Sequence, residues 1–176
     1  SPVSRSTGPG RRISLAAGGV AALLAVFLII SRESRLGTAL LVDRQRSIAV
    51  LPLKNYIDDN KGRSHLPDET TELLTTELAK SKQFRVVSRT TASRYRDTTS
   101  SLPEIARTLG VRWIVEGGVG AEGNRVYIKL RAVDSLSDRK VFADVYDCER
   151  GQLLEVNTKA ARSIESAIEA NLRSEQ

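Results

Sequence analysis

The sequence predicts a mixed α/β domain, with a five-stranded sheet and three helices, preceded by one transmembrane helix. Three observations carry this prediction. Residues 13–30 form an apolar run without a charge, residues 48–87 read as strand, helix and strand, and beyond Gly110 the apolar period changes from 3.6 to 2. We therefore expect a membrane anchor first, then a parallel unit, and last an antiparallel meander.

The run from Ile13 to Ile30 has the length and composition of a membrane-spanning helix. It contains no charge and no proline, and arginines stand on both sides of it. At about 1.5 Å per helical residue it would measure about 27 Å, close to the hydrocarbon thickness of a bilayer. A soluble helix of this length would need a polar face, which this run lacks. We therefore expect it to anchor the protein in a membrane.

A cleavable export signal is the main alternative to this anchor. Such signals have a shorter apolar stretch followed by a small-x-small cleavage site, and residues 37–39 offer only a poor and distant one. The pair Arg11-Arg12 resembles a twin-arginine signal, but Ser14 stands where such signals prefer a bulky apolar residue. We favour the permanent anchor, and a buried soluble helix fits the run least.

The rest of the chain divides by composition. Residues 1–12 consist mainly of Ser, Pro, Gly and Arg, which cannot bury a core, and the sequence contains no Met. We expect residues 1–12 to be a linker from an upstream domain and residues 31–46 to be a juxtamembrane connection. Residues 47–176 have the length and apolar content of one small domain.

The charge is concentrated around the apolar run. Residues 1–46 hold seven basic and two acidic side chains, whereas residues 47–176 hold 20 basic and 19 acidic ones, a net of +1. The basic flanks suit lipid headgroups, and the nearly neutral remainder gives no support to nucleic-acid binding. Since arginines flank both ends of the run, charge does not fix its orientation. The single Cys148 excludes an internal disulfide and a Cys-based zinc site.

The first half of the domain has the pattern of a parallel α/β unit. Residues 48–53 are continuously apolar, as in a strand covered on both faces, and a polar turn follows at residues 55–64. Pro67, with acids directly after it, begins a helix whose leucines recur at helical spacing. Residues 84–87 then read as a second short strand.

The second half begins with a short helix and continues as strands. Residues 101–104 form a capping box, and Gly110 ends the helix. Residues 113–115 begin a strand, residues 122–124 make a turn, and residues 125–133 alternate strictly between apolar and polar. The apolar set expected in the core is Val126, Ile128, Leu130 and Ala132. The set expected to face outward is Arg125, Tyr127, Lys129 and Arg131.

The chain then completes the meander. A polar turn at residues 134–138 leads into a third strand at residues 141–146. The last helix carries one apolar face between residues 153 and 172.

Five segments in this order resemble the TolB amino-terminal-like α/β domain, which is also related to the FlgO type. They cover essentially all of residues 47–169 and read SIAVLPLKN, LPDETTELLTTELAKSKQFRVVSRT, IARTLGVRWIVEGGV, NRVYIKLRAVD and FADVYD. The chain departs from the family at Glu69 and Thr70, where Gly and Leu are usual, and at Phe142, where Trp is common.

The resemblance implies a setting for the domain. In that family the module often follows a single membrane span, in CadC-like transcription activators that carry a cytoplasmic winged-helix DNA-binding domain. Similar chains carry adenylate cyclase or Ser/Thr kinase domains instead. The resemblance implies no catalytic residues.

Two surfaces are candidates for interaction. An acidic cluster lies around the first loop and the following helix start, and consists of Asp58, Asp59, Asp68, Glu69 and Glu72. Most such clusters are solvated turns and helix caps, but this one could bind a cation or a basic partner. The outward stripe Arg125, Tyr127, Lys129 and Arg131 resembles a nucleic-acid face with an interleaved aromatic. On a domain of net +1, a wetted sheet face or a protein contact is the better interpretation.

Other motifs have ordinary structural explanations. Residues 118–123 match the GxGxxG pattern, but a strand rather than a helix follows, so we interpret the glycines as part of a hairpin. His65 is the only imidazole, which excludes a multi-His metal site, and it stands at a helix start. Because no catalytic motif is recognisable, we expect no enzyme activity and no cofactor or metal in this domain.

We therefore expect a sensory or protein-interaction domain of a single-pass protein of the bacterial inner membrane, with the α/β domain in the periplasm. Its association with itself, as in a homodimer, or with a protein partner would change the proximity of cytoplasmic output domains. The alternative is an anchored or exported structural protein that docks into a larger envelope assembly. An enzymatic domain is a third reading, which would require turnover by the isolated domain.

Overall fold

The computed structural model describes residues 44–56 and 65–175. The apolar run at residues 13–30, the linker at residues 1–12 and the acidic pair Asp58 and Asp59 lie outside the described residues. Within the described ranges, no helix combines the length and the apolar character that crossing a membrane requires.

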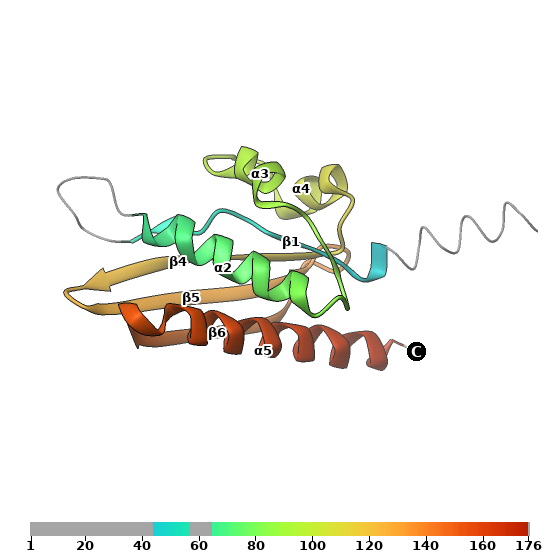
Figure 1. The fold of residues 1–176 in the computed structure, drawn as a ribbon. Helices are drawn as coiled ribbons and strands as arrows, with labels where there is room; N and C mark the ends of the chain where they lie inside the picture. Colours follow the sequence, from blue (N-terminus) through green and yellow to red (C-terminus); the bar gives the residue numbers. More distant parts are fainter. Residues whose placement is uncertain (1–43, 57–64, 176) are drawn as a thin grey trace, which may run out of the picture. The chain divides into compact units, whose positions relative to one another are not determined.

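The described residues form a mixed sheet of six strands (Figure 1). The strands are β1 (Ser47–Val50), β2 (Lys54–Asn55), β3 (Arg85–Val86), β4 (Trp113–Glu122), β5 (Arg125–Asp134) and β6 (Arg139–Glu149). The order is β3-β1-β4-β5-β6, and β2 pairs separately with β4. β1 runs parallel to both β3 and β4, whereas β4, β5 and β6 form an antiparallel meander. The predicted parallel start and antiparallel finish are both confirmed.

Four α-helices accompany this sheet in the described part of the chain. They are α2 (Leu66–Lys80), α3 (Arg89–Ala92), α4 (Leu102–Leu109) and α5 (Leu153–Ser174), with single 3-10 turns at Ser93–Tyr95 and Arg150–Gln152. α4 begins at the predicted capping box, where Ser101 N donates to Glu104 Oε2 at 3.0 Å. It ends at Gly110, whose φ of +65° lies in the left-handed region that favours glycine.

The prediction of five strands was wrong by one short strand. Residues 48–53 were expected to form a single strand, but β1 ends at Val50 and pairing with β4 resumes only at Lys54. Leu51 N still donates to Val115 O at 2.8 Å, but the next N–H on that side, Leu53 N, donates to Thr71 Oγ1 at 3.2 Å instead of continuing the ladder. The interruption separates β1 from β2, which pairs alongside β4 with Lys54 opposite Gly118 and Asn55 opposite Val119.

The prediction of three helices was wrong by one short helix. α3 was missed because its sequence, RTTA, has no apolar period from which a helix could be recognised. Its start is fixed locally, since Ser88 Oγ accepts a hydrogen bond from Thr91 N at 3.3 Å.

The two faces of the sheet are covered unequally. α2 and α5 lie side by side over one face (Figure 1), and the larger core lies between them and the sheet. This core contains the four predicted inward residues of β5, which are Val126, Ile128, Leu130 and Ala132. On the other face a smaller core under α3 and α4 covers β1 and the beginning of β4, as far as Ile114. Over the rest of that face, on the meander, none of the helices in the described residues packs against the sheet.

Candidate interaction surface

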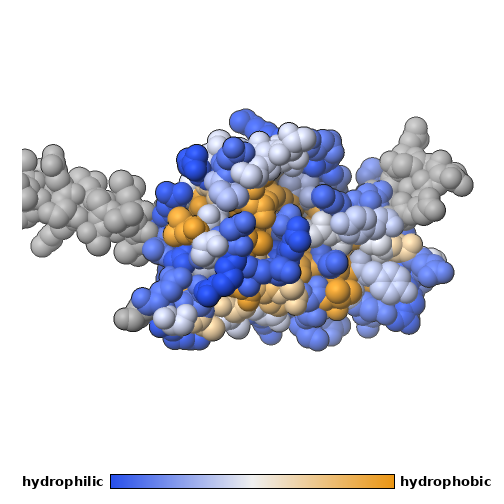
Figure 2. All heavy atoms as spheres, turned by 180° about the vertical axis from the view of Figure 1, so that it is seen from behind, coloured by the Kyte–Doolittle hydropathy of each residue, from blue (hydrophilic) through white to orange (hydrophobic). Residues whose placement is uncertain are grey.

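We call this uncovered part of the sheet the open face. Its residues follow from the strand register: Glu116, Gly118 and Gly120 on β4, Arg125, Tyr127, Lys129 and Arg131 on β5, and Ala143, Val145 and Asp147 on β6. The structure thus places all four residues of the predicted stripe on one exposed surface. Figure 2, seen from the side opposite that of Figure 1, shows apolar patches among hydrophilic residues.

Large apolar side chains are unusually exposed here. Tyr127 is 37% exposed and Val145 is 61% exposed, and Tyr56, which follows β2, is 60% exposed. Aromatic residues with one apolar and one polar end are enriched at protein interfaces, where they contribute much of the contact energy. The open face therefore has the composition of a surface that another protein could cover.

Charges of both signs alternate across the open face. Arg131 Nε donates to Glu116 Oε1 at 2.8 Å, and Arg125 Nε donates to Asp147 Oδ1 at 3.1 Å. The hydrogen bond with Asp147 raises the pKa of Arg125 above its ordinary value. Lys129 has no ion-pair partner among the described residues. A phosphate backbone would meet acidic groups along this surface, which does not fit a nucleic-acid track.

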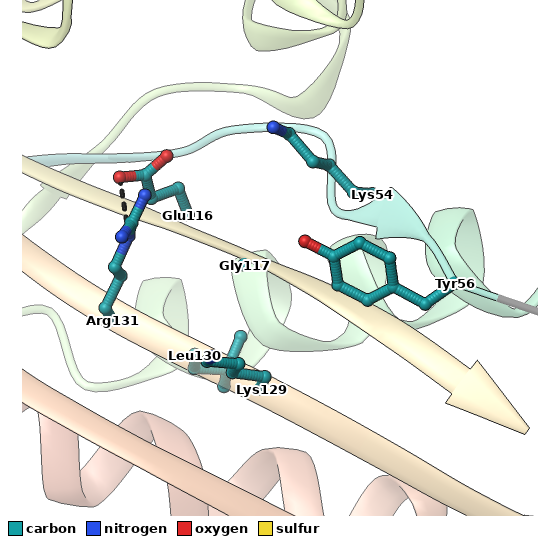
Figure 3. Close-up of a pocket in the computed structure, with 7 residues that line it drawn as sticks. All are labelled: Lys54, Tyr56, Glu116, Gly117, Lys129, Leu130 and Arg131. Carbon is teal, nitrogen blue, oxygen red and sulfur yellow. Dashed lines mark hydrogen bonds and ion pairs between the residues drawn. The ribbon is translucent and has the colours of Figure 1, made fainter.

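A depression lies where β2 meets the meander (Figure 3). Its side-chain walls are Lys54, Tyr56, Glu116, Lys129 and Arg131, its volume is about 110 Å³, and it opens to solvent. A second depression of about 330 Å³ shares Lys54, Glu116 and Arg131 and continues to the start of α4. We call the two depressions together the groove.

The groove depends on Gly118. A side chain at this position would overlap with Cε2 of Tyr56, and its Cβ would lie 2.7 Å from Cδ2 of the same ring. The missing side chain therefore allows Tyr56 to lie directly over β4. Of the six residues in the GxGxxG match, five lie in β4 and Gly123 lies in the hairpin turn with a φ of +59°. The hairpin interpretation was thus correct for Gly123 but missed the contact made by Gly118.

The predicted acidic cluster is partly engaged within the domain. Asp68 pairs with Arg96, and Glu72 Oε2 lies 2.5 Å from Arg89 Nε, so these two acids join α2 to the segment of α3. Glu69 is exposed in the first turn of α2, and its N–H donates to the carbonyl of His65 at 2.9 Å. Nowhere in residues 44–56 and 65–175 do three or more His, Cys, Asp or Glu side chains lie together as a metal site would require.

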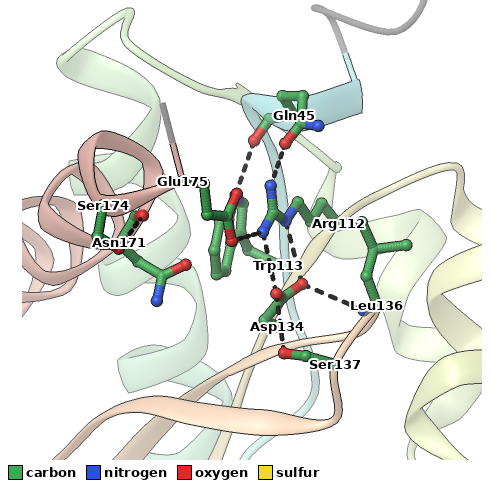
Figure 4. A network of polar contacts seen from close by, with 9 residues as sticks. All are labelled: Gln45, Arg112, Trp113, Asp134, Leu136, Ser137, Asn171, Ser174 and Glu175. Atoms are coloured by element: carbon green, nitrogen blue, oxygen red, sulfur yellow. Dashed lines mark hydrogen bonds and ion pairs between the residues drawn. The ribbon is translucent and has the colours of Figure 1, made fainter.

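A buried polar cluster occupies the end of the sheet where β4 begins and β5 ends (Figure 4). Arg112 and Asp134 are both almost fully buried, and they form two parallel hydrogen bonds, Nε to Oδ1 at 3.1 Å and an Nη to Oδ2 at 3.0 Å. Burial disfavours the charge of Arg112, but hydrogen bonds with Asp134 and Glu175 outweigh it and raise the pKa of the guanidinium.

This cluster joins segments that are distant in the sequence. Arg112 also donates to the Gln45 side chain and, over 2.5 Å, to Glu175 Oε1 near the end of α5. Trp113 Nε1 donates to the carbonyl of Gln45 at 2.8 Å, and the Arg112 guanidinium lies 4.5 Å from the centre of the Trp113 ring. The first described turn and the last described helix are therefore held together by one buried arginine.

The sequence did not predict the residues that complete the groove and the buried cluster around Arg112. The prediction placed Tyr56 in the polar turn at residues 55–64 and Lys54 between that turn and the strand at residues 48–53. Pro52 is the signal that could have marked a second pairing segment. Arg112 precedes a run of buried residues, but nothing in the sequence states that Asp134 would lie opposite it.

No protein-family model matches the chain. It is 30% identical to a protein named "Putative adenylate cyclase 3" from Rhizobium meliloti (strain 1021), over 126 residues that make up 72% of this chain and 21% of that protein. The chain thus spans about a fifth of the length of this relative.

Among solved structures, TolB from Acinetobacter baumannii is similar with a TM-score of 0.50 and 14% identity, covering 69% of this chain and 28% of that one. The C-terminal domain of LpoB from Salmonella enterica gives a TM-score of 0.48 and 15% identity, over 61% of this chain and 84% of that one. The likeness to TolB shows a shared fold, which supports the TolB-like fold that the sequence resemblance implies.

Proposed function

We propose that residues 44–175 form a non-enzymatic protein-interaction domain of a single-pass membrane signalling protein. The apolar run at residues 13–30 is the anchor, the domain lies outside the cytoplasm, and its association with itself or a protein partner brings cytoplasmic output domains together. The observation that carries the proposal is the open face. Tyr56, Tyr127 and Val145 are exposed beside one another there, over strands that no helix of the described ranges covers.

Two further observations support this reading. The relative from Rhizobium meliloti carries the name of an adenylate cyclase, and the chain corresponds to only about a fifth of it, which suits an accessory domain attached to an output domain. The chemistry of the open face agrees, since its carboxylates Glu116 and Asp147 each pair with an arginine and so are not free to act as a general acid or base.

The cluster around Arg112 provides a physical route between the open face and the predicted anchor. Gln45 belongs to the predicted juxtamembrane connection, and it contacts both Arg112 and Trp113 at the beginning of β4. Arg46 adds an ion pair to Glu169 of α5, with Nη1 and Oε1 2.5 Å apart. A shift of the meander on association is transmitted through these contacts to the segment that leads to the membrane.

A proximity reporter tests this function. A reporter that is active only when two copies are adjacent is fused before Ser1 and expressed in cells that naturally make the protein. We expect activity to require residues 47–176 and to fall when Tyr127→Ala is introduced, whereas Leu154→Ala leaves it unchanged. Leu154 is a matched control because it is 55% exposed but lies on α5, on the opposite side of the sheet. Full activity after deletion of residues 47–176 would contradict the proposal.

The topology is tested separately by fusing alkaline phosphatase or β-galactosidase after Gln176. An active phosphatase with an inactive galactosidase is the expected result, and the reverse pattern would reject an extracytoplasmic domain. If the phosphatase fusion is active but the proximity reporter is never active, the signalling proposal fails. The alternative, an anchored envelope structural protein, is then favoured.

A further inference from the structure

The groove carries a net positive charge on a domain that is otherwise nearly neutral. Lys54, Lys129 and Arg131 line its smaller depression against the carboxylate of Glu116, which gives a net charge of +2 there, and Arg96 in the larger depression is paired with Asp68. Among the described residues, neither Lys54 nor Lys129 takes part in an ion pair. Elsewhere on the open face, Arg125 is neutralised by Asp147. The excess positive charge is therefore local to the groove.

The dimensions of the groove limit what it can hold. Pockets for whole cofactors or drug-sized ligands measure about 300–1,000 Å³ and enclose most of the ligand. The depression beside Tyr56 has about 110 Å³ and is open, so it suits one side chain rather than a complete cofactor. The adjoining depression of about 330 Å³ leads away from it toward Thr98 and Ser100, whose hydroxyl groups offer further hydrogen bonds. Two connected depressions of this kind suit a continuous chain that places one side chain in the smaller of them.

The walls of the smaller depression select an anionic side chain with some apolar surface. Figure 3 shows Lys54, Tyr56 and Arg131 around the same stretch of β4, with Glu116 joined to Arg131. A carboxylate there would receive charge-assisted hydrogen bonds from lysine, while its methylene groups pack on the Tyr56 ring. A nucleic acid fits less well, because its next phosphates would approach Glu116 and Asp147.

We propose that the groove binds an acidic segment of a partner protein, with one carboxylate between Lys54 and Lys129. The inference rests on the proposed interaction function and adds the chemistry of the partner. Tyr127 and Val145 lie beside the groove on the same face and supply apolar contact area for the residues that flank the acidic one.

A peptide titration tests the inference. The full 176-residue chain is kept in a mild detergent, and a fluorescently labelled glutamate-rich peptide is titrated by anisotropy against its glutamine-rich counterpart. We expect only the glutamate peptide to bind, with an affinity that falls as salt is added. Lys54→Gln combined with Lys129→Gln should weaken binding by about tenfold or more, which corresponds to about 1.4 kcal/mol.

Two variants separate a lost site from a disturbed fold. Lys140→Gln is the matched control, because Lys140 is also exposed and lies on β6 outside both depressions, and it should bind as the wild type does. Glu116→Gln removes the one carboxylate that the described residues contribute to the groove and should strengthen binding, a direction that a folding defect would not produce.

Several results would overturn the inference. Equal binding of both peptides, equal weakening by Lys140→Gln, or tighter binding of a single-stranded oligonucleotide or inorganic phosphate at the same lysines would each reject an acidic protein segment. If the proximity reporter still depends on Tyr127 while the peptide does not bind, this inference fails and the proposed function stands. If neither responds, both fail.

Discussion

The ring of Tyr56 occupies the space that a side chain at Gly118 would fill. A Cβ at residue 118 would overlap with Cε2 of the ring and lie 2.9 Å from Cζ. The two residues belong to segments that pair in parallel, since Lys54 lies opposite Gly118 in the register of β2 and β4. One glycine thus fixes the position of an exposed aromatic ring at the edge of the groove.

We predict that Gly118→Ala alters the groove but hardly affects stability. The new methyl group must displace the Tyr56 ring, which can move because it is 60% exposed and its far end meets solvent. The free energy of unfolding should change by less than about 1 kcal/mol. Urea unfolding followed by the fluorescence of Trp113, the only tryptophan, measures this change. Binding of the glutamate peptide should fall in the same variant.

The neighbouring Gly117→Ala should instead destabilise the domain. A Cβ at residue 117 would overlap with the carbonyl oxygen of Lys129 and lie 3.2 Å from Cα of Leu130, and these backbone atoms belong to a central strand that cannot move aside. We expect a loss of about 1–3 kcal/mol or more in the same unfolding assay. Equal effects of the two alanine variants would show that Tyr56 is not placed as described.

We predict that Asp134→Ala strongly destabilises the domain. The variant leaves the Arg112 guanidinium buried without its two parallel hydrogen bonds, and removing one partner of such a pair costs about 3–5 kcal/mol. Glu175→Ala is the control, because Glu175 also contacts Arg112 but is 40% exposed, and it should cost less than about 1 kcal/mol. A small effect of Asp134→Ala would mean that solvent reaches Arg112 in the folded protein.

The same pair makes stability depend on pH in the acid range. Burial raises the pKa of Asp134, but hydrogen bonds from Arg112, Leu136 N and Ser137 outweigh it, so the pKa lies below its ordinary value of 3.8. Because the folded-state pKa is lowered, this contribution is fully present above the ordinary value and is lost as pH falls through the folded-state pKa. Asp134→Asn should therefore be much less stable than wild type at neutral pH, and the difference should narrow below about pH 4. Parallel urea curves at each pH measure this difference, and a constant gap would contradict the assignment.

Gln45→Ala should weaken coupling without weakening association. Gln45 is exposed, so its side chain adds little to stability, but it accepts a hydrogen bond from Arg112 and leads toward the predicted anchor. We expect the proximity reporter to lose activity while the glutamate peptide still binds with wild-type affinity. Unchanged reporter activity would place the coupling elsewhere in the domain.

The sequence was sufficient where a local pattern determines the structure. Strict alternation in residues 125–133 predicted the faces of β5, and the capping box with Gly110 predicted both ends of α4. These features depend on neighbouring residues alone. The TolB-like fold was likewise accessible, because the order of its elements is visible along the chain.

What the sequence did not reveal depends on contacts between distant segments. Pro52 divides an apolar run that looks continuous, and the second pairing segment is only two residues long. The groove arises because Tyr56 reaches Gly118, and the buried pair arises because Arg112 meets Asp134 across the start of the meander. The spacing between Tyr56 and Gly118, or between Arg112 and Asp134, is not set by local secondary-structure propensity. These two contacts are therefore visible only in the folded structure.

Site-specific photo-crosslinking tests the central claim, that the open face is where this domain contacts another protein. A photoreactive phenylalanine analogue replaces Tyr127 or, as control, Leu154 in the full-length protein, and cells that naturally make it are irradiated. We predict a discrete crosslinked species at Tyr127, either a second copy or one partner, that is lost when Lys129→Glu is added, and none at Leu154. Equal crosslinking at both positions, or crosslinking at Leu154 alone, would contradict the claim.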